Sequence, residues 1–457
     1  MLNKVFKLKE NNTNIRTEVI AGITTFVTMA YILAVNPAIL ADGTGMNAAA
    51  ILIATAISSF VGSLLMALLA NYPFALAPGL GLNAYFAYTV VGSMGVSWET
   101  ALLAVFFEGI IFILLSVTNV REAIFNAIPK NLKLAVSAGL GLFITIIGLT
   151  NAKVTVTGST ILKIRDFSVN VNSETVGAIL ALIGVIITAI LLVKNIKGGI
   201  LLGILITWVL GIIAESVGLY VPAPELEMYS VIPSEFITFD FSSFGETFGK
   251  VFTSANFGEI KILDFIVVIF AFLFVDLFDT LGTLIGVSTK ANMLDEDGKL
   301  PKIKGALLAD AIATSVGAVC GTSTTTTFVE SAAGVTEGGR TGLTALTTGF
   351  LFLISVIFAP LFLTIPSFAT APALIIVGFY MIGNIVKIDF EDMTEGIPAF
   401  LCIIAMPFLY SISEGISFGV ISYAIINLVT GSYKKKKISI IIYILAVLFL
   451  LKYFFLN

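Results

Sequence analysis

Successive apolar runs of about the length of a bilayer-spanning helix fill most of this chain, and this pattern constrains the fold more than any other feature. The 457 residues are 58% hydrophobic and only 12% charged, with a mean hydropathy of +1.04. A soluble protein of this size needs more charged residues for the surface that faces water, and fewer long apolar runs. The sequence therefore predicts an all-α polytopic membrane protein.

The runs fall into two sets of seven. Since an odd number of spans turns the second set over relative to the first, we expect 14 transmembrane segments in two inverted seven-segment repeats. The chain then divides into a tail at 1–16, a first repeat at 17–219, a loop at 220–261, a second repeat at 262–431 and a C-terminal part at 432–457. The expected segments are 17–40, 47–69, 74–92, 98–117, 131–150, 174–193 and 198–219, then 262–286, 304–320, 325–338, 341–363, 370–386, 396–411 and 414–431.

The basic residues predict the orientation of these segments. With the N-terminus in the cytoplasm, nineteen lysines and arginines fall in cytoplasmic connections and five fall outside, with Lys452 set aside. The tail has no apolar core before a small-residue cleavage site, so we interpret it as a retained cytoplasmic tail and not as a signal peptide. The loop 220–261 is acidic and fits the outside. The apolar run 438–451 after the lysine run 434–437 is either an interfacial helix or an extra span.

The third segment of each repeat is short and irregular. In the first half it contains Pro and Gly in PFALAPGLGLN, and in the second it contains a threonine run in CGTSTTTTFVESAAGV. A polar stretch at membrane depth cannot face lipid, so it must be buried in protein or line a wet cavity. We expect an extended lead-in followed by a half-helix in segments 3 and 10, with the two half-helices meeting near the bilayer centre, as in the substrate sites of secondary transporters.

Acids within the apolar segments are the strongest candidates for function, because burying a charge in the membrane is costly. They are Glu108, Asp276, Asp279, Asp310 and Glu330. Asp276 and Asp279 are three residues apart and share a helix face, where two close carboxylates do not both ionise readily. The chain has no histidine, so any proton coupling must use carboxylates. Asp276 and Asp310 could instead brace a broken helix.

Weaker signals surround these acids. Asn83 could point into the site or cap the first half-helix, and Phe328 could stack on a flat ligand or only pack. Ser331 follows Glu330 directly. On the first segment Thr25, Thr28, Tyr31 and Asn36 could line a cavity or bond to nearby backbone. The two cysteines, Cys320 and Cys402, predict no disulfide framework and have no metal-ligand spacing.

Several of these stretches together resemble one family. AGITTFVTMAYILAVNPAIL, NYPFALAPGLGLNAYFAYTVV, FLFVDLFDTLGTLIG and GALLADAIATSVGAVCGTSTTTTFVESAAGV are similar to nucleobase–cation symporter family 2, and within it to the AzgA-like purine permeases. The resemblance covers nearly the whole chain. It implies a core domain of segments 1–4 and 8–11 and a gate domain of segments 5–7 and 12–14, with substrate bound between them.

The resemblance also implies roles for individual residues. The substrate-binding carboxylates of the family fall on Asp279 and Glu330, and its supporting acid in segment 9 falls on Asp310. Some relatives have a histidine one turn after the segment 8 acid, where this chain has Thr283. We extend the expected substrate-binding set to Phe328, Ser331, Asn83 and Thr25, and assign Asp276, Asp310 and Glu108 to proton coupling or support.

The implied function is secondary active uptake of a purine nucleobase, such as guanine, hypoxanthine or adenine, across the cytoplasmic membrane. The proton is the expected coupling ion, and no cofactor or metal is expected. The expected partners are the nucleobase, the lipid bilayer and a second copy in a homodimer, with no nucleic acid. The alternatives are an anion carrier or exchanger of the same fold, an uncoupled nucleobase facilitator, an ion channel and, least supported, a membrane enzyme.

Overall fold

A computed structural model describes residues 2–118, 128–157, 162–168, 173–219, 230, 232–253, 262–291, 293–294, 300–432, 436 and 438–455. Parts of the expected outer loop, including Glu225, Glu227 and Glu259, lie outside these residues, as do Lys434, Lys435 and Lys437 of the lysine run. Ten helices of the described part are long and apolar enough to cross a membrane, and three shorter apolar helices accompany them. The expectation of an all-α polytopic membrane protein is confirmed.

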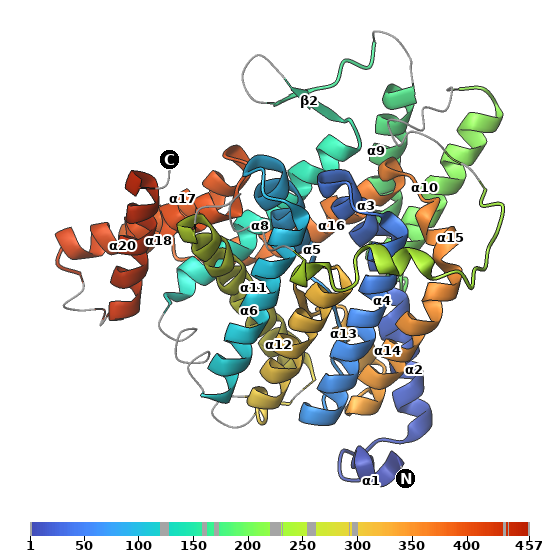
Figure 1. The fold of residues 1–457 in the computed structure, drawn as a ribbon, viewed down its shortest axis with the longest axis horizontal. Coiled ribbons are helices and arrows are strands. Elements are labelled where there is room, and N and C mark those ends of the chain that lie inside the picture. Colours follow the sequence, from blue (N-terminus) through green and yellow to red (C-terminus); the bar gives the residue numbers. More distant parts are fainter. Residues whose placement is uncertain are drawn as a thin grey trace.

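The first half of the chain forms the helices expected from its apolar runs (Figure 1). A short helix, α1 (Leu2–Val5), precedes them. The bounds are α2 (Ile15–Met29), α3 (Ile32–Thr44), α4 (Ala48–Leu65), η1 (Met66–Ala70), β1 (Leu76–Pro78), α5 (Leu80–Ala84), η2 (Tyr85–Ser93), α6 (Trp98–Val117), α8 (Lys130–Asn151), β2 (Thr155–Thr157), β3 (Leu162–Ile164), α9 (Ser173–Val193) and α10 (Gly199–Ser216).

The second half repeats this order after the two short helices η4 (Ser242–Glu246) and η5 (Lys250–Phe252). Its bounds are α11 (Ile262–Lys290), α12 (Ile303–Cys320), β4 (Thr325–Thr327), α13 (Ser331–Thr336), α14 (Gly342–Ser355), η6 (Val356–Phe358), α15 (Ala359–Leu363), α16 (Ser367–Ile382), η7 (Gly383–Lys387), α17 (Met393–Phe408), α18 (Ile412–Val429) and α20 (Ile440–Phe455). Elements thus coincide with all fourteen expected segments, while the number that span the bilayer stays a prediction.

Most boundaries lie within a few residues of the expected ones, and three differences have a structural meaning. The first segment is one apolar run in sequence, yet the structure breaks it at Ala30 and Tyr31 into α2 and α3. The helix α16 begins at Ser367, three residues before the expected start, and α17 begins at Met393 on the Asp392 N-cap. The start of α17 lies before the apolar run because a side-chain acceptor fixes a helix start more sharply than hydropathy does.

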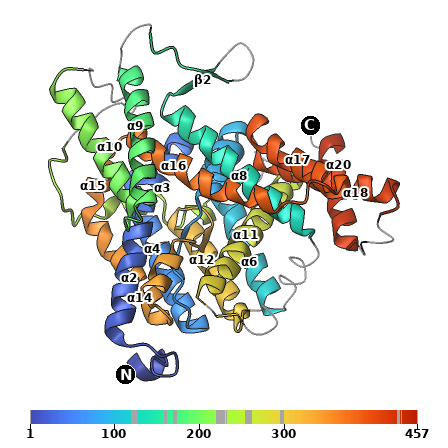
Figure 2. The ribbon, with the colours of Figure 1, turned by 180° about the vertical axis from the view of Figure 1, so that it is seen from behind.

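The helices pack into two groups (Figures 1 and 2). In one group α14 packs on α2 and α4, and α12 packs on α4 and α6. To the same group belong α3, which packs on α4 and η2, α11, which packs on α6, and α13, which packs on α2. In the other α16 packs on α8, α9 and α10, while α17 packs on α8 and α18. The helices α17, α18 and α20 extend to one side of the molecule in both views. We call the first group the α4–α12 bundle and the second the α8–α16 bundle.

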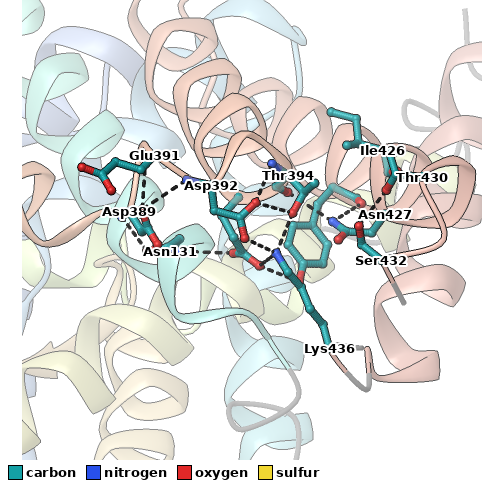
Figure 3. A network of polar contacts seen from close by, with 12 residues as sticks. Asn131, Asp389, Glu391, Asp392, Thr394, Ile426, Asn427, Thr430, Ser432 and Lys436 are labelled. Carbon is teal, nitrogen blue, oxygen red and sulfur yellow. Dashed lines mark hydrogen bonds and ion pairs between the residues drawn. The ribbon is translucent and has the colours of Figure 1, made fainter. Parts of the chain in front are cut away.

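A polar network fixes the start of α17 (Figure 3). Lys436 Nζ donates to Asp392 Oδ2 at 2.6 Å, to Thr394 Oγ1 at 2.5 Å and to Glu395 Oε1 at 3.0 Å. Asn131 Nδ2 of α8 donates to Glu395 Oε2 at 3.2 Å. The hydrogen bond from Lys436 holds the pKa of the Asp392 carboxyl below its usual range. This network joins the segment after α18 to the start of α17 and to α8.

Candidate functional site

The two interrupted segments cross each other inside the protein. Strands β1 and β4 pair antiparallel, with Leu76 opposite Thr327, Ala77 opposite Thr326 and Pro78 opposite Thr325. Outside the strands, the Gly79 N–H donates to the Thr324 carbonyl and the Phe328 N–H donates to the Ala75 carbonyl, each at 3.0 Å. The pairing satisfies backbone groups that lipid could not. The expected extended lead-in and following half-helix are present in both segments, β1 before α5 and β4 before α13.

Glu330 stands at the start of the second half-helix. It precedes α13 directly, and its Oε1 accepts a hydrogen bond of 2.7 Å from the hydroxyl of Tyr31. Tyr31 is 1% exposed and lies in the break between α2 and α3. Glu330 itself is half-buried. The break in the first segment thus brings a phenol hydroxyl to the carboxylate, which leaves the remaining acceptor positions of Glu330 for a ligand.

Asp279 approaches the same crossing from α11. Its Oδ2 lies 3.3 Å from the Thr326 hydroxyl of β4, which donates to it, and the side chain is half-buried. Asp279 interacts electrostatically with Glu330 and with Asp310. The structure therefore brings together the two acids that the sequence singled out for substrate binding, Asp279 beside β4 and Glu330 between β4 and α13.

The other three intramembrane acids are completely buried. The Thr280 hydroxyl lies 3.0 Å from Asp276 Oδ1 and 2.9 Å from Asp310 Oδ1, so it connects α11 to α12. Glu108 Oε2 of α6 accepts from the Thr324 hydroxyl at 2.6 Å. The sequence predicted only that Asp276 and Asp279 share a helix face. The structure shows in addition that Thr280 connects Asp276 to Asp310. These acids lie behind the crossing and hold its supporting helices together.

The remaining predicted site residues take part in the packing of the crossing. The Asn83 carbonyl oxygen accepts from the Ser323 hydroxyl, and the N-cap of α5 is Gly79, so Asn83 does not cap that helix. The Ser331 hydroxyl oxygen accepts from the Ala75 N–H at 3.0 Å. Phe328 is 7% exposed. Whether any of these three touches a substrate stays a prediction.

The polar residues of the first segment make different contacts, and only the two threonines show the backbone bonding that the sequence offered as one alternative. Thr25 and Thr28 donate to backbone carbonyls of their own helix, Thr25 to Ala21 at 3.0 Å. Asn36 Nδ2 instead donates to the hydroxyls of Thr55 and Thr322 at 2.7 and 3.0 Å. Thr25 is fully buried, and a substrate contact there stays a prediction.

Sequence reasoning missed the hydroxyls that carry these contacts, together with one acid. Thr280, Thr324 and Thr326 each bond to a carboxyl group, but threonine is too common in membrane helices for its position to signal this role. Glu18 is fully buried and accepts from the Arg340 N–H at 2.9 Å and the Thr344 hydroxyl at 2.6 Å, at the start of α14. Its place inside the first apolar run was the signal that could have revealed it.

Within the described residues no cluster of three or more His, Cys, Asp or Glu side chains could hold a metal ion. The residues that the structure brings to the crossing are hydrogen-bond acceptors and hydroxyls. Such groups recognise a neutral polar ligand with its own N–H donors.

A cavity of about 500 Å³ lies between the two bundles, and the described residues that line it include none of the five intramembrane acids. The α4–α12 bundle contributes the end of α3 and Tyr88 of η2, and the α8–α16 bundle contributes the end of α8 and the start of α16. Across it, the Tyr88 hydroxyl donates to Asp42 Oδ2 and accepts from Asn151 Nδ2, both at 2.9 Å. A hydrogen bond between the bundles is thus part of the cavity wall.

Comparison with solved structures supports the fold. The transmembrane domain of the cyanobacterial bicarbonate transporter BicA is similar with a TM-score of 0.63 at 15% identity, covering 89% of this chain and 97% of that domain. Murine solute carrier 26 family member A9, an anion transporter, is similar with a TM-score of 0.59 at 12% identity, covering 92% of this chain and 69% of that one. At these identities the likeness shows the fold alone, and it confirms the expected inverted-repeat architecture.

Comparison with sequences gives the family. The guanine/hypoxanthine permease PbuG of Bacillus subtilis is 44% identical over 461 residues, covering 99% of each chain. The adenine permease AdeP of Escherichia coli is 41% identical over 460 residues, covering 100% of this chain and 97% of the permease. The model of the permease family matches residues 16–418. The resemblance seen in the sequence is confirmed, and the chain belongs to the permease family that includes these purine permeases.

Proposed function

We propose that this protein is a secondary transporter that takes up purine nucleobases across the cytoplasmic membrane. The single observation that carries the proposal is the meeting of Asp279 and Glu330 at the crossing of two broken segments, in a chain that matches guanine/hypoxanthine and adenine permeases along its whole length. Both relatives described above are permeases, which supports a transporter over an enzyme.

The chemistry of a purine suits this arrangement. A purine base is flat and uncharged, and its ring and exocyclic N–H groups are donors. Two ionised carboxylates are strong acceptors for such donors, since hydrogen bonds to charged groups are shorter and stronger than neutral ones. Glu330 is kept in position by Tyr31 and Asp279 by Thr326. The apolar ring of Phe328 lies next to the same crossing and would cover part of one face of the base.

The division into two bundles supports a mechanism in which one bundle moves relative to the other. We place the substrate between the α4–α12 bundle, which carries both acids, and the α8–α16 bundle, in line with alternating access around a fixed site. The cavity at the ends of α3, α8 and α16 then forms part of the route on one side of the site. From the distribution of basic residues, we place the N-terminus in the cytoplasm and this cavity on the outer side.

Proton coupling and a homodimer remain parts of the same proposal. The chain lacks histidine, so a carboxyl group must carry any coupled proton. The resemblance supports a dimer through the α8–α16 bundle. No cofactor is needed for this kind of transport.

An anion exchanger is the competing function, because the similar solved structures include a bicarbonate transporter. The two half-buried acids oppose this function, since an anion would meet like charge at the crossing. An uncoupled facilitator differs from our proposal only in its response to a proton gradient.

The test is uptake of radiolabelled hypoxanthine by a permease-deficient cell that expresses this chain. Unlabelled adenine, guanine, xanthine, uracil and bicarbonate serve as competitors, and an imposed proton gradient in de-energised vesicles tests coupling. We expect saturable uptake that purines block and bicarbonate leaves unchanged. Absence of hypoxanthine uptake by a chain present at the cell surface contradicts purine transport, and uptake that ignores the gradient replaces coupling by facilitated diffusion.

A further inference from the structure

The cavity between the two bundles has the size and the lining of a small-molecule site. Its volume of about 500 Å³ falls within the range of about 300–1,000 Å³ that is usual for pockets that hold small ligands. The described residues that line it combine aliphatic side chains of α3 and α16 with the rings of Tyr88 and Tyr410 and several polar groups. This combination suits a ligand that is both flat and polar.

This cavity is separate from the crossing of the two broken segments. Tyr31, which binds Glu330, is the N-cap of α3, whereas Asp42, which lines the cavity, lies in the last turn of the same helix. A helix of 13 residues is about 20 Å long. One purine base cannot span that length, so a base in the cavity and a base at the acids occupy two different sites.

A chain of hydrogen bonds crosses the cavity from one bundle to the other. Asn151 Nδ2 of α8 donates to the Tyr88 hydroxyl, which donates to Asp42 Oδ2, both at 2.9 Å. Among the described residues, no hydrogen bond uses Asp42 Oδ1 or Asn151 Oδ1. Both oxygens are acceptors. Each can therefore accept from an N–H group of a ligand in the cavity.

The charges of the lining favour a neutral ligand. The charged side chains among the described lining residues are one carboxylate, Asp42, and one ammonium group, Lys153. Because they balance each other, the cavity as a whole attracts neither an anion nor a cation strongly. A ligand with both donors and acceptors can use the two groups together, since the carboxylate accepts hydrogen bonds and the ammonium group donates them. Purine bases carry both kinds of group on one flat ring system.

Tyr410 lies at the cavity with a strained backbone. It follows α17 and the C-cap Leu409 with a φ of 52°, in the left-handed region that glycine or asparagine usually occupies after a helix. A bulky residue with such a φ is rare, and this kind of strain is typical of functional sites. The Tyr410 ring meets the Tyr88 ring at 6.4 Å and the Phe143 ring at 5.3 Å between centroids, both edge to face. The strained position thus holds an aromatic surface between the two bundles, where a flat ligand can stack.

We propose that this cavity is an entry site, in which the purine base binds before it reaches Asp279 and Glu330. In the entry site the base lies against the ring of Tyr410, and one of its N–H groups donates to Asp42. The inference rests on the proposed function and deepens it, because it adds a second binding position for the same substrate on the uptake side.

The position of the cavity in the fold agrees with this role. The helix α8 ends at Asn151, and β2, which follows it, lies at the opposite end of the molecule from the N-terminus in both views (Figures 1 and 2). With the N-terminus in the cytoplasm, as the basic residues predict, the cavity lies toward the outside. A base that enters from the outside then meets Asp42 and Tyr410 before the acids of the crossing.

The test is equilibrium dialysis of radiolabelled hypoxanthine against the purified full-length protein. Asp279→Asn combined with Glu330→Gln removes both carboxylates of the crossing, so binding that remains in this double variant reports the cavity. Asp42→Asn or Tyr410→Leu is then added to the double variant. The matched controls are Tyr410→Phe, which keeps the ring, and Asp240→Asn, which makes the same change at an exposed aspartate outside the cavity lining.

We expect the double variant to keep a weaker binding of hypoxanthine. Asp42→Asn should weaken this residual binding by about tenfold, because it removes a hydrogen bond to a charged group. Tyr410→Leu should weaken it by a similar factor, because it removes the stacking surface, while both controls leave it unchanged. In the otherwise unchanged protein, Asp42→Asn should raise the hypoxanthine concentration at half-maximal uptake and preserve the maximal rate and the melting temperature.

Several results would overturn this inference. An absence of residual binding in the double variant, residual binding that Asp42→Asn leaves unchanged, or equal losses in Asp42→Asn and Asp240→Asn each contradict an entry site. Asp42 is exposed, so its variant decides the question even where Tyr410→Leu fails to fold. A parent protein that neither binds nor takes up hypoxanthine contradicts purine transport itself. Measurements on the parent therefore distinguish failure of the proposed function from failure of the inference.

Discussion

The two crossing segments share a backbone plan but differ in chemistry. The first, β1 with α5 and η2, contains no Asp, Glu, Lys or Arg and is rich in small and apolar residues. The second, β4 with α13, carries hydroxyls at every strand position and Glu330 before its half-helix. Inverted repeats thus reproduce the geometry of a site without reproducing its ligands. One segment supplies a closely packed surface, and the other supplies the charge.

The two half-helices also differ in what they pack against. A Cβ at Gly81 of α5 would lie 2.5 Å from Leu140 Cδ2 of α8, which belongs to the other bundle. A Cβ at Gly334 of α13 would lie 2.1 Å from the Thr25 hydroxyl and 2.6 Å from the Ala21 carbonyl, both on α2 of its own bundle. The charged half-helix is therefore packed within its own bundle, and the apolar one contacts the other bundle, past which it would move in the proposed transport cycle.

The largest effect is expected from Glu330→Gln, which removes the carboxylate at the start of the second half-helix. A hydrogen bond to a charged group contributes about 1.5–3 kcal/mol, so we expect hypoxanthine affinity to fall by about 10- to 100-fold. The measurement is direct binding of labelled hypoxanthine to the purified protein. Glu337→Gln, at the other end of α13, is the matched control. Equal losses in both variants would show that charge on α13 in general, and not Glu330, matters.

Next comes Gly79→Ala in the first crossing segment. The added Cβ would lie 2.7 Å from Thr326 Cγ2 and 3.4 Å from Asp279 Oδ2, so it should displace Thr326 from Asp279. We expect uptake to fall by about tenfold, the equivalent of one hydrogen bond to a charged group. Adding Thr326→Ser removes the clashing methyl and keeps the hydroxyl, so the double variant should regain most uptake. If it does not, the glycine is needed for another reason.

Gly81→Ala tests the contact between the bundles. Its Cβ would overlap the Leu140 side chain, and overpacking of this kind costs about 1–3 kcal/mol. We expect a lower maximal rate of uptake with little change in hypoxanthine affinity, because Gly81 meets the other bundle and not an acid. Leu140→Ala in the same chain makes room and should restore the rate. A change in affinity alone would place Gly81 at the substrate and not at the moving surface.

Asn83→Ala separates a structural role from a ligand role for that side chain. Loss of its carbonyl leaves the buried Ser323 hydroxyl without its acceptor, at a cost of about 1–3 kcal/mol in stability. Replacing both partners, Asn83→Ala with Ser323→Ala, should recover thermal stability. Uptake measured in the double variant then decides the role: recovery shows that Asn83 only supports the crossing, and continued loss shows that it contacts the base.

The smallest effect is expected from Lys436→Met, outside the two crossing segments. Lys436 is partly exposed, and such ion pairs contribute about 0–1 kcal/mol. Because the folded-state pKa of Asp392 is depressed, its share of stability is present above the unfolded value of about 4 and is lost as pH falls through the folded value. The melting temperature of the variant should therefore lie slightly below that of the parent at pH 6–8 and equal it in more acidic solution. Lys9→Met, an exposed lysine in the tail, is the control.

Much of the fold could be predicted from the sequence because lipid imposes one simple rule, that backbone groups must be satisfied within the protein. From this rule the long apolar runs could be assigned to helices. The interruptions could be assigned to the Pro and Gly of the first crossing segment and to the threonine run of the second. The break between α2 and α3 was not predicted, since its residues are as apolar as their neighbours. It carries Tyr31, the hydroxyl that binds Glu330.

The sequence by itself determined the membrane class, because its apolar runs can be counted along the chain, and it marked the two broken segments and the five costly acids as departures from that apolar composition. Only the tertiary structure decided how the acids divide. Asp279 and Glu330 remain half-buried at the crossing, while Glu108, Asp276 and Asp310 are enclosed behind it. Burial depends on which helices pack together across more than two hundred residues of chain, and no local pattern contains that information.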